Sequence, residues 1–130
     1  MDSSVFSVDS RKPVQKVGED LLAACARNKF GVLGTIDLKA KMKEKGVEYA
    51  GDCLIFEICN PQQAKKALDA DPQISAALPC RVSVFGTPGG TRLSTIRPTV
   101  MLALFGAKGI ESVAKEVETT ITAIMNEAAR

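Results

Sequence analysis

The sequence predicts one domain in which helices and strands are mixed, and three observations lead to this prediction. Its 130 residues fit a single ordinary domain, so we expect one domain over residues 1–130. Short apolar runs typical of strands alternate with segments that have the three- and four-residue apolar spacing of amphipathic helices. The turn sequence Thr87-Pro88-Gly89-Gly90 separates two strand-like runs and predicts an antiparallel hairpin.

Composition and charge exclude several classes of protein. Apolar residues make up 45% of the chain and charged residues 25%, as in globular domains. A net charge of +2 gives no electrostatic argument for binding nucleic acid or an anionic membrane. The N-terminus, residues 1–4, has no signal-peptide pattern, and no stretch approaches the ~18 apolar residues of a membrane-spanning helix. We therefore expect a cytoplasmic protein without a membrane partner.

Histidine is absent from the sequence, which removes the commonest general base and the commonest metal ligand. Mechanisms that need a Ser-His-Asp or Cys-His arrangement are excluded within one chain. The four cysteines are too few and too widely spaced for a disulfide framework, and no pair forms a C-x-x-C motif. We expect reduced thiols, and the sequence identifies no catalytic residue, no metal ligand set and no cofactor.

The first third of the chain predicts a strand over Val5–Val8 and a helix that ends near Asn28. Asp9 or Ser10 is the expected cap of this helix, with Pro13 in its first turn. The apolar run from residue 30 to 36 is bounded by turn residues and predicts a second strand.

Asp37 is the expected N-cap of a helix over Leu38–Lys45. Its four lysines occupy alternate positions, which point in different directions on a helix, so they indicate a solvated surface.

The strand Cys53–Cys59 has two different faces. One set of alternate residues is entirely apolar and is expected to meet the helices: Leu54, Phe56 and Ile58. The other set mixes apolar and polar side chains: Cys53, Ile55, Glu57 and Cys59. Because this second face is not fully polar, we expect a ligand or a second copy of the chain to cover it.

The remaining elements follow from caps and turns. Asn60 is the expected N-cap of a helix that begins at Pro61 and ends at Asp71-Pro72. The hairpin joins Arg81–Phe85 to Arg92–Ile96.

A helical region opens at Arg97-Pro98 and is interrupted near Phe105–Gly109 by two glycines. The last helix, Ile110–Ala128, carries a continuous apolar stripe.

Several short motifs resemble the family catalogued as domain of unknown function 302. They are, in order, Gly31-Val32, Thr35-Ile36-Asp37-Leu38, Cys59-Asn60-Pro61, Asp71-Pro72 and Leu78-Pro79-Cys80-Arg81-Val82. The resemblance covers residues 14–96, while the helices over 98–128 match in general character. It implies an α+β fold of two layers with a curved, mainly antiparallel sheet backed by helices, similar to the TATA-box-binding-protein-like fold. It also implies a segment-exchanged homodimer, and no activity.

Five residues form the candidate site: Glu57, Cys59, Asn60, Cys80 and Arg81. Cys59 ends one strand and Cys80 begins another, so the two thiols lie at the same sheet end only if these strands are antiparallel neighbours, which the family favours. A close pair could form a reversible disulfide or bind a soft metal, with Glu57 adding a carboxylate. The alternative is structural, with both cysteines filling space at strand ends.

The sequence leads to three functional hypotheses. The first is a non-enzymatic cytoplasmic homodimer that binds a small ligand or partner protein on the sheet face opposite its helices. The second is a thiol-based redox or metal-binding protein that uses Cys59 and Cys80. Nucleic-acid binding through the sheet is the third, and few aromatic residues and a balanced charge argue against it. Arg81, Arg92 and Arg97 could form a basic edge for an anionic ligand, or be separate solvated residues.

Overall fold

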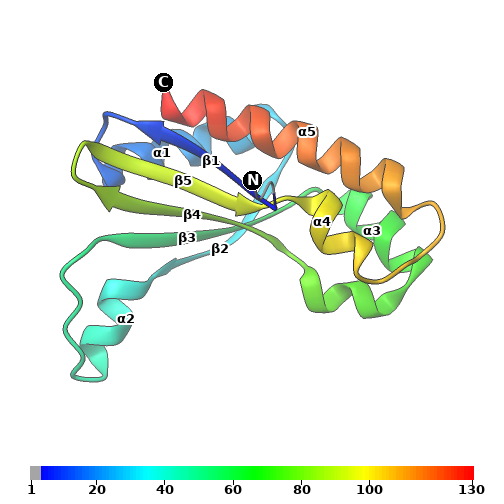
Figure 1. The fold of residues 1–130 in the computed structure, drawn as a ribbon, viewed down its shortest axis with the longest axis horizontal. Coiled ribbons are helices and arrows are strands. Elements are labelled where there is room, and N and C mark those ends of the chain that lie inside the picture. The colour runs from blue at the N-terminus through cyan, green and yellow to red at the C-terminus, as the bar shows by residue number, and fades with distance from the viewer. Residues whose placement is uncertain (1–3) are drawn as a thin grey trace.

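Five strands form one sheet in the order β1-β5-β4-β3-β2, and every neighbouring pair is antiparallel (Figure 1). The computed structural model describes residues 4–130. Residues 1–3, most of the stretch that carries no signal-peptide pattern, lie outside the described residues. The strands are β1 (Val5–Ser10), β2 (Gly31–Asp37), β3 (Cys53–Cys59), β4 (Cys80–Thr87) and β5 (Gly90–Ile96). The predicted α+β class and antiparallel sheet are confirmed.

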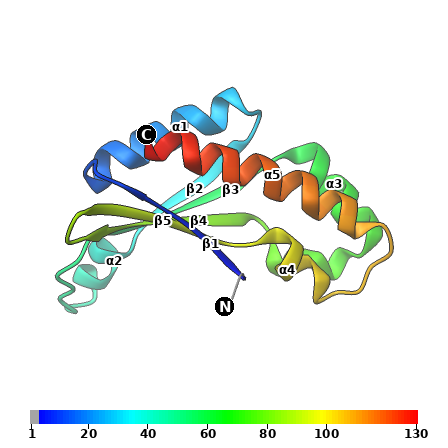
Figure 2. The same cartoon turned by 45° about the horizontal axis from the view of Figure 1, so that its top comes forward.

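The helices α1 (Val14–Arg27) and α5 (Ile110–Ala129) cover one face of this sheet (Figure 1). The other helices are α2 (Leu38–Glu44), α3 (Pro61–Ala70), the 3-10 helix η1 (Pro72–Ala77) and α4 (Pro98–Ala103). The helices α1 and α5 lie side by side over the sheet, while α3 and α4 gather near one end of it (Figure 1 and Figure 2). The short helix α2 lies on the other side of the sheet and contains no buried residue, as its lysines predict (Figure 1).

The covered face contains the main apolar core. Phe56 and Ile58 of β3 are buried under the helices and Leu54 packs at the margin, which confirms the predicted inner face of this strand. The stripe predicted on the last helix is also buried, at Ile110, Ala114, Val117, Ile121, Ile124, Met125 and Ala128. Each large apolar side chain buried in this way stabilises the fold by about 1.5–3 kcal/mol.

Two of the predicted helix caps are confirmed. The Asp37 carboxylate accepts a hydrogen bond from the backbone N–H of Ala40 at 3.0 Å. The Asn60 side-chain oxygen accepts hydrogen bonds from the backbone N–H groups of Gln62 and Gln63 at 3.0 and 3.1 Å. Each cap satisfies backbone donors that have no partner within the first turn of a helix.

The predicted cap of α1 is wrong. The helix begins after Pro13 and no side chain caps its first turn. Neither Asp9 nor Ser10 is available for this role, because β1 continues through both residues. Asp9 instead forms an ion pair with Arg92 of β5, with 2.7 Å between Oδ1 and Nε.

The predicted hairpin is confirmed by the pairing of Thr87 with Gly90, which leaves Pro88 and Gly89 as the turn. Gly90 has a φ of +148° and lies against the end of β1. A Cβ atom at this position would lie 2.3 Å from the carbonyl oxygen of Ser10, so the close approach of the two segments requires glycine.

The face of the sheet away from α1 and α5 is called the open face below. Strand alternation and register assign to it Val5, Ser7, Asp9, Gly34, Ile36, Cys53, Ile55, Glu57, Arg81, Ser83, Phe85, Arg92, Ser94 and Ile96. It is therefore a mixture of apolar, hydroxyl and charged side chains. Within residues 4–130, no helix is both long enough and apolar enough to span a membrane.

Candidate functional site: a groove on the open face

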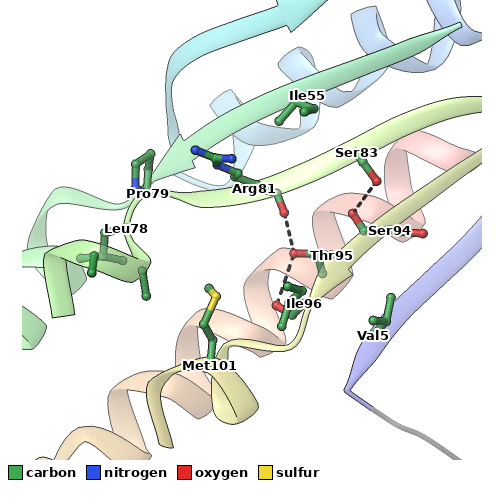
Figure 3. Close-up of a pocket in the computed structure, with 12 residues that line it drawn as sticks. Val5, Ile55, Leu78, Pro79, Arg81, Ser83, Ser94, Thr95, Ile96 and Met101 are labelled. Atoms are coloured by element: carbon green, nitrogen blue, oxygen red, sulfur yellow. Dashed lines mark hydrogen bonds between the residues drawn. The ribbon is translucent and has the colours of Figure 1, made fainter. Parts of the chain in front are cut away.

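A groove of about 470 Å³ lies on the open face, and Figure 3 shows the side chains around it. Eight of the twelve described residues that line it are apolar: Val5, Ile55, Ala76, Ala77, Leu78, Pro79, Ile96 and Met101. The other four are Arg81, Ser83, Ser94 and Thr95. A mostly apolar lining with a few polar groups, in a volume of this size, is typical of small-molecule sites.

The wall of the groove comes from η1 and α4. Ile74 of η1 and Leu102 of α4 are buried together in a second apolar cluster, which fixes both helices at the end of the sheet. Ala76, Ala77 and Met101 are close to these anchors in sequence and line the groove. The wall is thus held by this cluster, against which the groove-lining residues Ala77 and Leu78 also pack.

A row of three serines crosses the open face into the groove. Ser7, Ser94 and Ser83 are directly opposite one another in β1, β5 and β4. The Ser7 and Ser94 hydroxyl oxygens lie 2.8 Å apart. The Ser83 hydroxyl donates to the carbonyl oxygen of Ser94 at 3.3 Å (Figure 3). Ser83 and Ser94 therefore give the apolar groove a hydroxyl-bearing floor.

The structure brings together two of the predicted site residues, Glu57 and Arg81. They are register partners in β3 and β4, and Arg81 Nη2 lies 3.4 Å from Glu57 Oε2. The side chain of Arg81 is 63% exposed and that of Glu57 is 22% exposed. Arg81 lines the groove, while Glu57 lies beside it on the neighbouring strand.

The three arginines of the possible basic edge are each paired with a different carboxylate. Arg92 contacts both carboxylate oxygens of Asp9, at 2.7 and 3.3 Å. Arg97 Nη1 donates to Glu118 at 3.2 Å. Of the three, Arg81 is the one that lines the groove.

The other three predicted residues lie around a different and much smaller cavity. Since β3 and β4 are antiparallel neighbours, Cys59 and Cys80 lie at the same end of the sheet. Both line a small cavity of about 30 Å³, together with Asn60, which also caps α3. The five candidate residues are thus divided between two places rather than gathered in one.

Both thiols at this cavity are neutral near pH 7. Burial raises the pKa of Cys80 to about 11, with a further contribution from the nearby Cys59 thiol. Burial also raises the pKa of Cys59 above its ordinary value of 9.0. Because the thiolate is the reactive form of cysteine, these shifts reduce reactivity. Within the part of the chain that the structure describes, no three side chains of the metal-ligating types are grouped to hold a metal ion.

Sequence reasoning did not identify most of the groove. Its wall residues Ala76 and Met101 are ordinary apolar residues of short helices, with no local signal. The pairing of Ser83 with Ser94 could have been predicted from the sequence, because a turn at Pro88-Gly89 places them opposite each other in the hairpin.

The fold and the groove define a small α+β domain that has helices on one sheet face and a pocket on the other. The chain belongs to the family described as domain of unknown function DUF302, whose model matches residues 6–128 and so extends beyond the motif-bearing residues 14–96. It is similar to the crystal structure of an uncharacterized conserved DUF302 protein from Bacillus stearothermophilus. The TM-score is 0.92 at 25% identity, over 99% of this chain and 100% of the other. A comparison with curated proteins finds no match.

Proposed function

We propose that this chain is a non-enzymatic, cytoplasmic and homodimeric binding domain that holds a small, largely apolar molecule in the groove on its open face. The observation that carries the proposal is the groove itself, with eight apolar lining residues and a volume of about 470 Å³. Burial of apolar ligand surface supplies about 25 cal/mol per Å² before the costs of association. The hydroxyls of Ser83 and Ser94 give orientation rather than most of the affinity.

Binding is tested with 1-decanol, an uncharged apolar probe, in a titration followed by backbone amide NMR. We expect shifts at Ser83, Ser94 and Met101, which surround the groove. Ala76→Trp is expected to abolish them, because position 76 is exposed and lines the groove, so the larger side chain fills it.

The matched control is Ser75→Trp, one residue away in the same helix, at an exposed position that does not line the groove. This variant is expected to bind 1-decanol as the unmodified chain does. Absence of binding by the unmodified chain, or equal loss in both variants, would overturn the proposal.

A homodimer is supported by large apolar side chains that are exposed outside the groove. Leu33, on the edge strand β2, is 66% exposed, and Leu104, after α4, is 81% exposed. A second copy that covered such residues would remove them from water. Native mass spectrometry is expected to give twice the mass of one chain, and a monomer at micromolar concentration would contradict this part of the proposal.

The alternative function is a thiol-based redox or metal-binding role for Cys59 and Cys80. Its support is that both thiols line one cavity. The raised pKa of each thiol favours the groove as the functional site.

A further inference from the structure

Among the described residues that line the groove, Arg81 supplies the one formal charge. No carboxylate is found in the lining within residues 4–130, and Glu57 lies beside the groove rather than in it. In Figure 3 the Arg81 side chain extends from β4 toward β3. A ligand in this groove therefore meets a mostly apolar wall together with a single cationic group.

The guanidinium of Arg81 is less fully paired than that of Arg92 on the same face. Arg92 makes two contacts to Asp9, at 2.7 and 3.3 Å, which occupy both carboxylate oxygens. Arg81 makes a single contact with Glu57, with 3.4 Å between Nη2 and Oε2. This distance is longer than the roughly 2.7–2.9 Å of a strong charge-assisted hydrogen bond. A guanidinium has five N–H donors, so Arg81 keeps donors for a ligand.

Gly34 of β2 makes room for the carboxylate that pairs with Arg81. Gly34 and Glu57 are opposite each other, and a Cβ atom at position 34 would lie 3.0 Å from Glu57 Oε1. Since β2 and β4 flank β3 on opposite sides, the Glu57 carboxylate has one oxygen near β2 and the other near Arg81. Glu57 thus partly neutralises Arg81 from the side of β3.

We propose that the ligand is an amphipathic monocarboxylate, with its carboxylate held by Arg81 and its apolar part against Leu78, Ala77 and Met101. This inference rests on the proposed function and names the chemical class of its ligand. A planar guanidinium matches a carboxylate through two parallel hydrogen bonds. One cation, already partly balanced by Glu57, suits a single negative charge better than the charge of nearly two on a phosphate monoester.

The test compares three ten-carbon probes with the same chain, namely decanoate, 1-decanol and decyl phosphate, below their micelle-forming concentrations and at pH 7.5. Isothermal titration calorimetry is expected to show decanoate binding about tenfold or more tightly than 1-decanol, as for a hydrogen bond to a charged group. Arg81→Gln is expected to remove this preference, so that decanoate and 1-decanol bind the variant with similar affinity. Arg92→Gln, which removes an arginine of the same face outside the groove, is expected to preserve it.

The outcomes separate this inference from the proposed function. If 1-decanol binds and decanoate binds no better, or if decyl phosphate binds most tightly, the monocarboxylate class is wrong and the groove remains a binding site. A preference that survives Arg81→Gln also overturns the inference. If none of the three probes binds, the proposed function fails as well. Circular dichroism and thermal melting establish that each variant is folded before its affinity is compared.

Discussion

The carboxylate of Glu118 in α5 accepts two hydrogen bonds from Thr99 in the first turn of α4, one from the backbone N–H at 3.0 Å and one from the hydroxyl at 2.7 Å. The N-cap residue of α4, Arg97, makes no capping hydrogen bond with its side chain. Glu118 therefore caps α4 from a different helix. Because α4 carries Met101 at the groove, this contact joins the wall of the site to the helical layer.

We expect Glu118→Gln to lower the free energy of unfolding by about 1–2 kcal/mol, because it weakens a charge-assisted cap. Thr99→Ala removes the hydroxyl partner but leaves the backbone N–H. Chemical denaturation of both single variants and the double variant gives their coupling, which should be about 0.5 kcal/mol or more. If the losses of unfolding free energy in the two single variants were strictly additive in the double variant, the hydrogen bond between the Thr99 hydroxyl and Glu118 would contribute nothing to stability.

The same carboxylate makes stability depend on acid pH. Burial raises the pKa of Glu118, but the hydrogen bonds from Thr99 and Arg97 lower it by more, so the net shift is downward from 4.5. The unfolded chain then binds a proton at higher pH than the folded chain does, so this stabilisation is present above about pH 4.5 and is lost as the pH falls through the lower folded pKa. Denaturation curves at several pH values should show a smaller acid loss for Glu118→Gln. Identical pH profiles would contradict the assignment.

Gly90 and Gly89 offer a matched pair at the hairpin. Gly90→Ala is expected to destabilise the fold by about 2 kcal/mol or more, because its Cβ would meet the Ser10 carbonyl oxygen at 2.3 Å at a φ of +148°. Gly89→Ala has nothing within 4 Å of its Cβ and should change stability by about 0.5 kcal/mol or less. Thermal melting of the two variants checks this difference, and equal melting temperatures would be inconsistent with the close approach of Gly90 to the end of β1.

The elements of this fold were predictable because their signals are local. Asn60 followed by Pro61 predicted the start of α3, and the sequence Pro88-Gly89 predicted the hairpin turn, with both residues of each pair adjacent in the chain. The prediction at Asp9 failed because the contact that decides its role is not local. Its carboxylate was equally suited to a cap or to an ion pair, and pairing with Arg92, 83 residues away, decided between them.

The candidate site was predictable only in part for the same reason. Glu57 and Arg81 are brought together by the register of β3 and β4, and the sequence predicted both residues but not their contact. The groove combines chain segments near residues 5, 55, 76–83, 94–96 and 101, and no short stretch contains enough of it to be recognised. Its shape depends on how η1 and α4 pack at the end of the sheet.

Thiol reactivity tests the redox alternative. With a pKa of about 11, Cys25 and Cys80 have a thiolate fraction at pH 8 about a hundredfold smaller than a thiol with a pKa of 9.0. We expect iodoacetamide to modify both slowly in the folded chain and rapidly in urea, as measured by mass spectrometry of peptides. Rapid labelling of Cys80 in the folded state, or a Cys59–Cys80 disulfide after mild oxidation, would support the alternative function.

If the ligand is a carboxylate, we expect Glu57 to weaken its binding, because Glu57 partly neutralises Arg81. Glu57→Gln removes a negative charge beside Arg81, whose Nη2 lies 3.4 Å from the Glu57 carboxylate, and frees the guanidinium from its partner. Decanoate should then bind about threefold more tightly, while 1-decanol should bind as before. Glu48→Gln makes the same change in net charge at an exposed position outside the groove and is the control. An equal gain in both variants would mean that overall charge, and not the pairing with Arg81, governs the affinity.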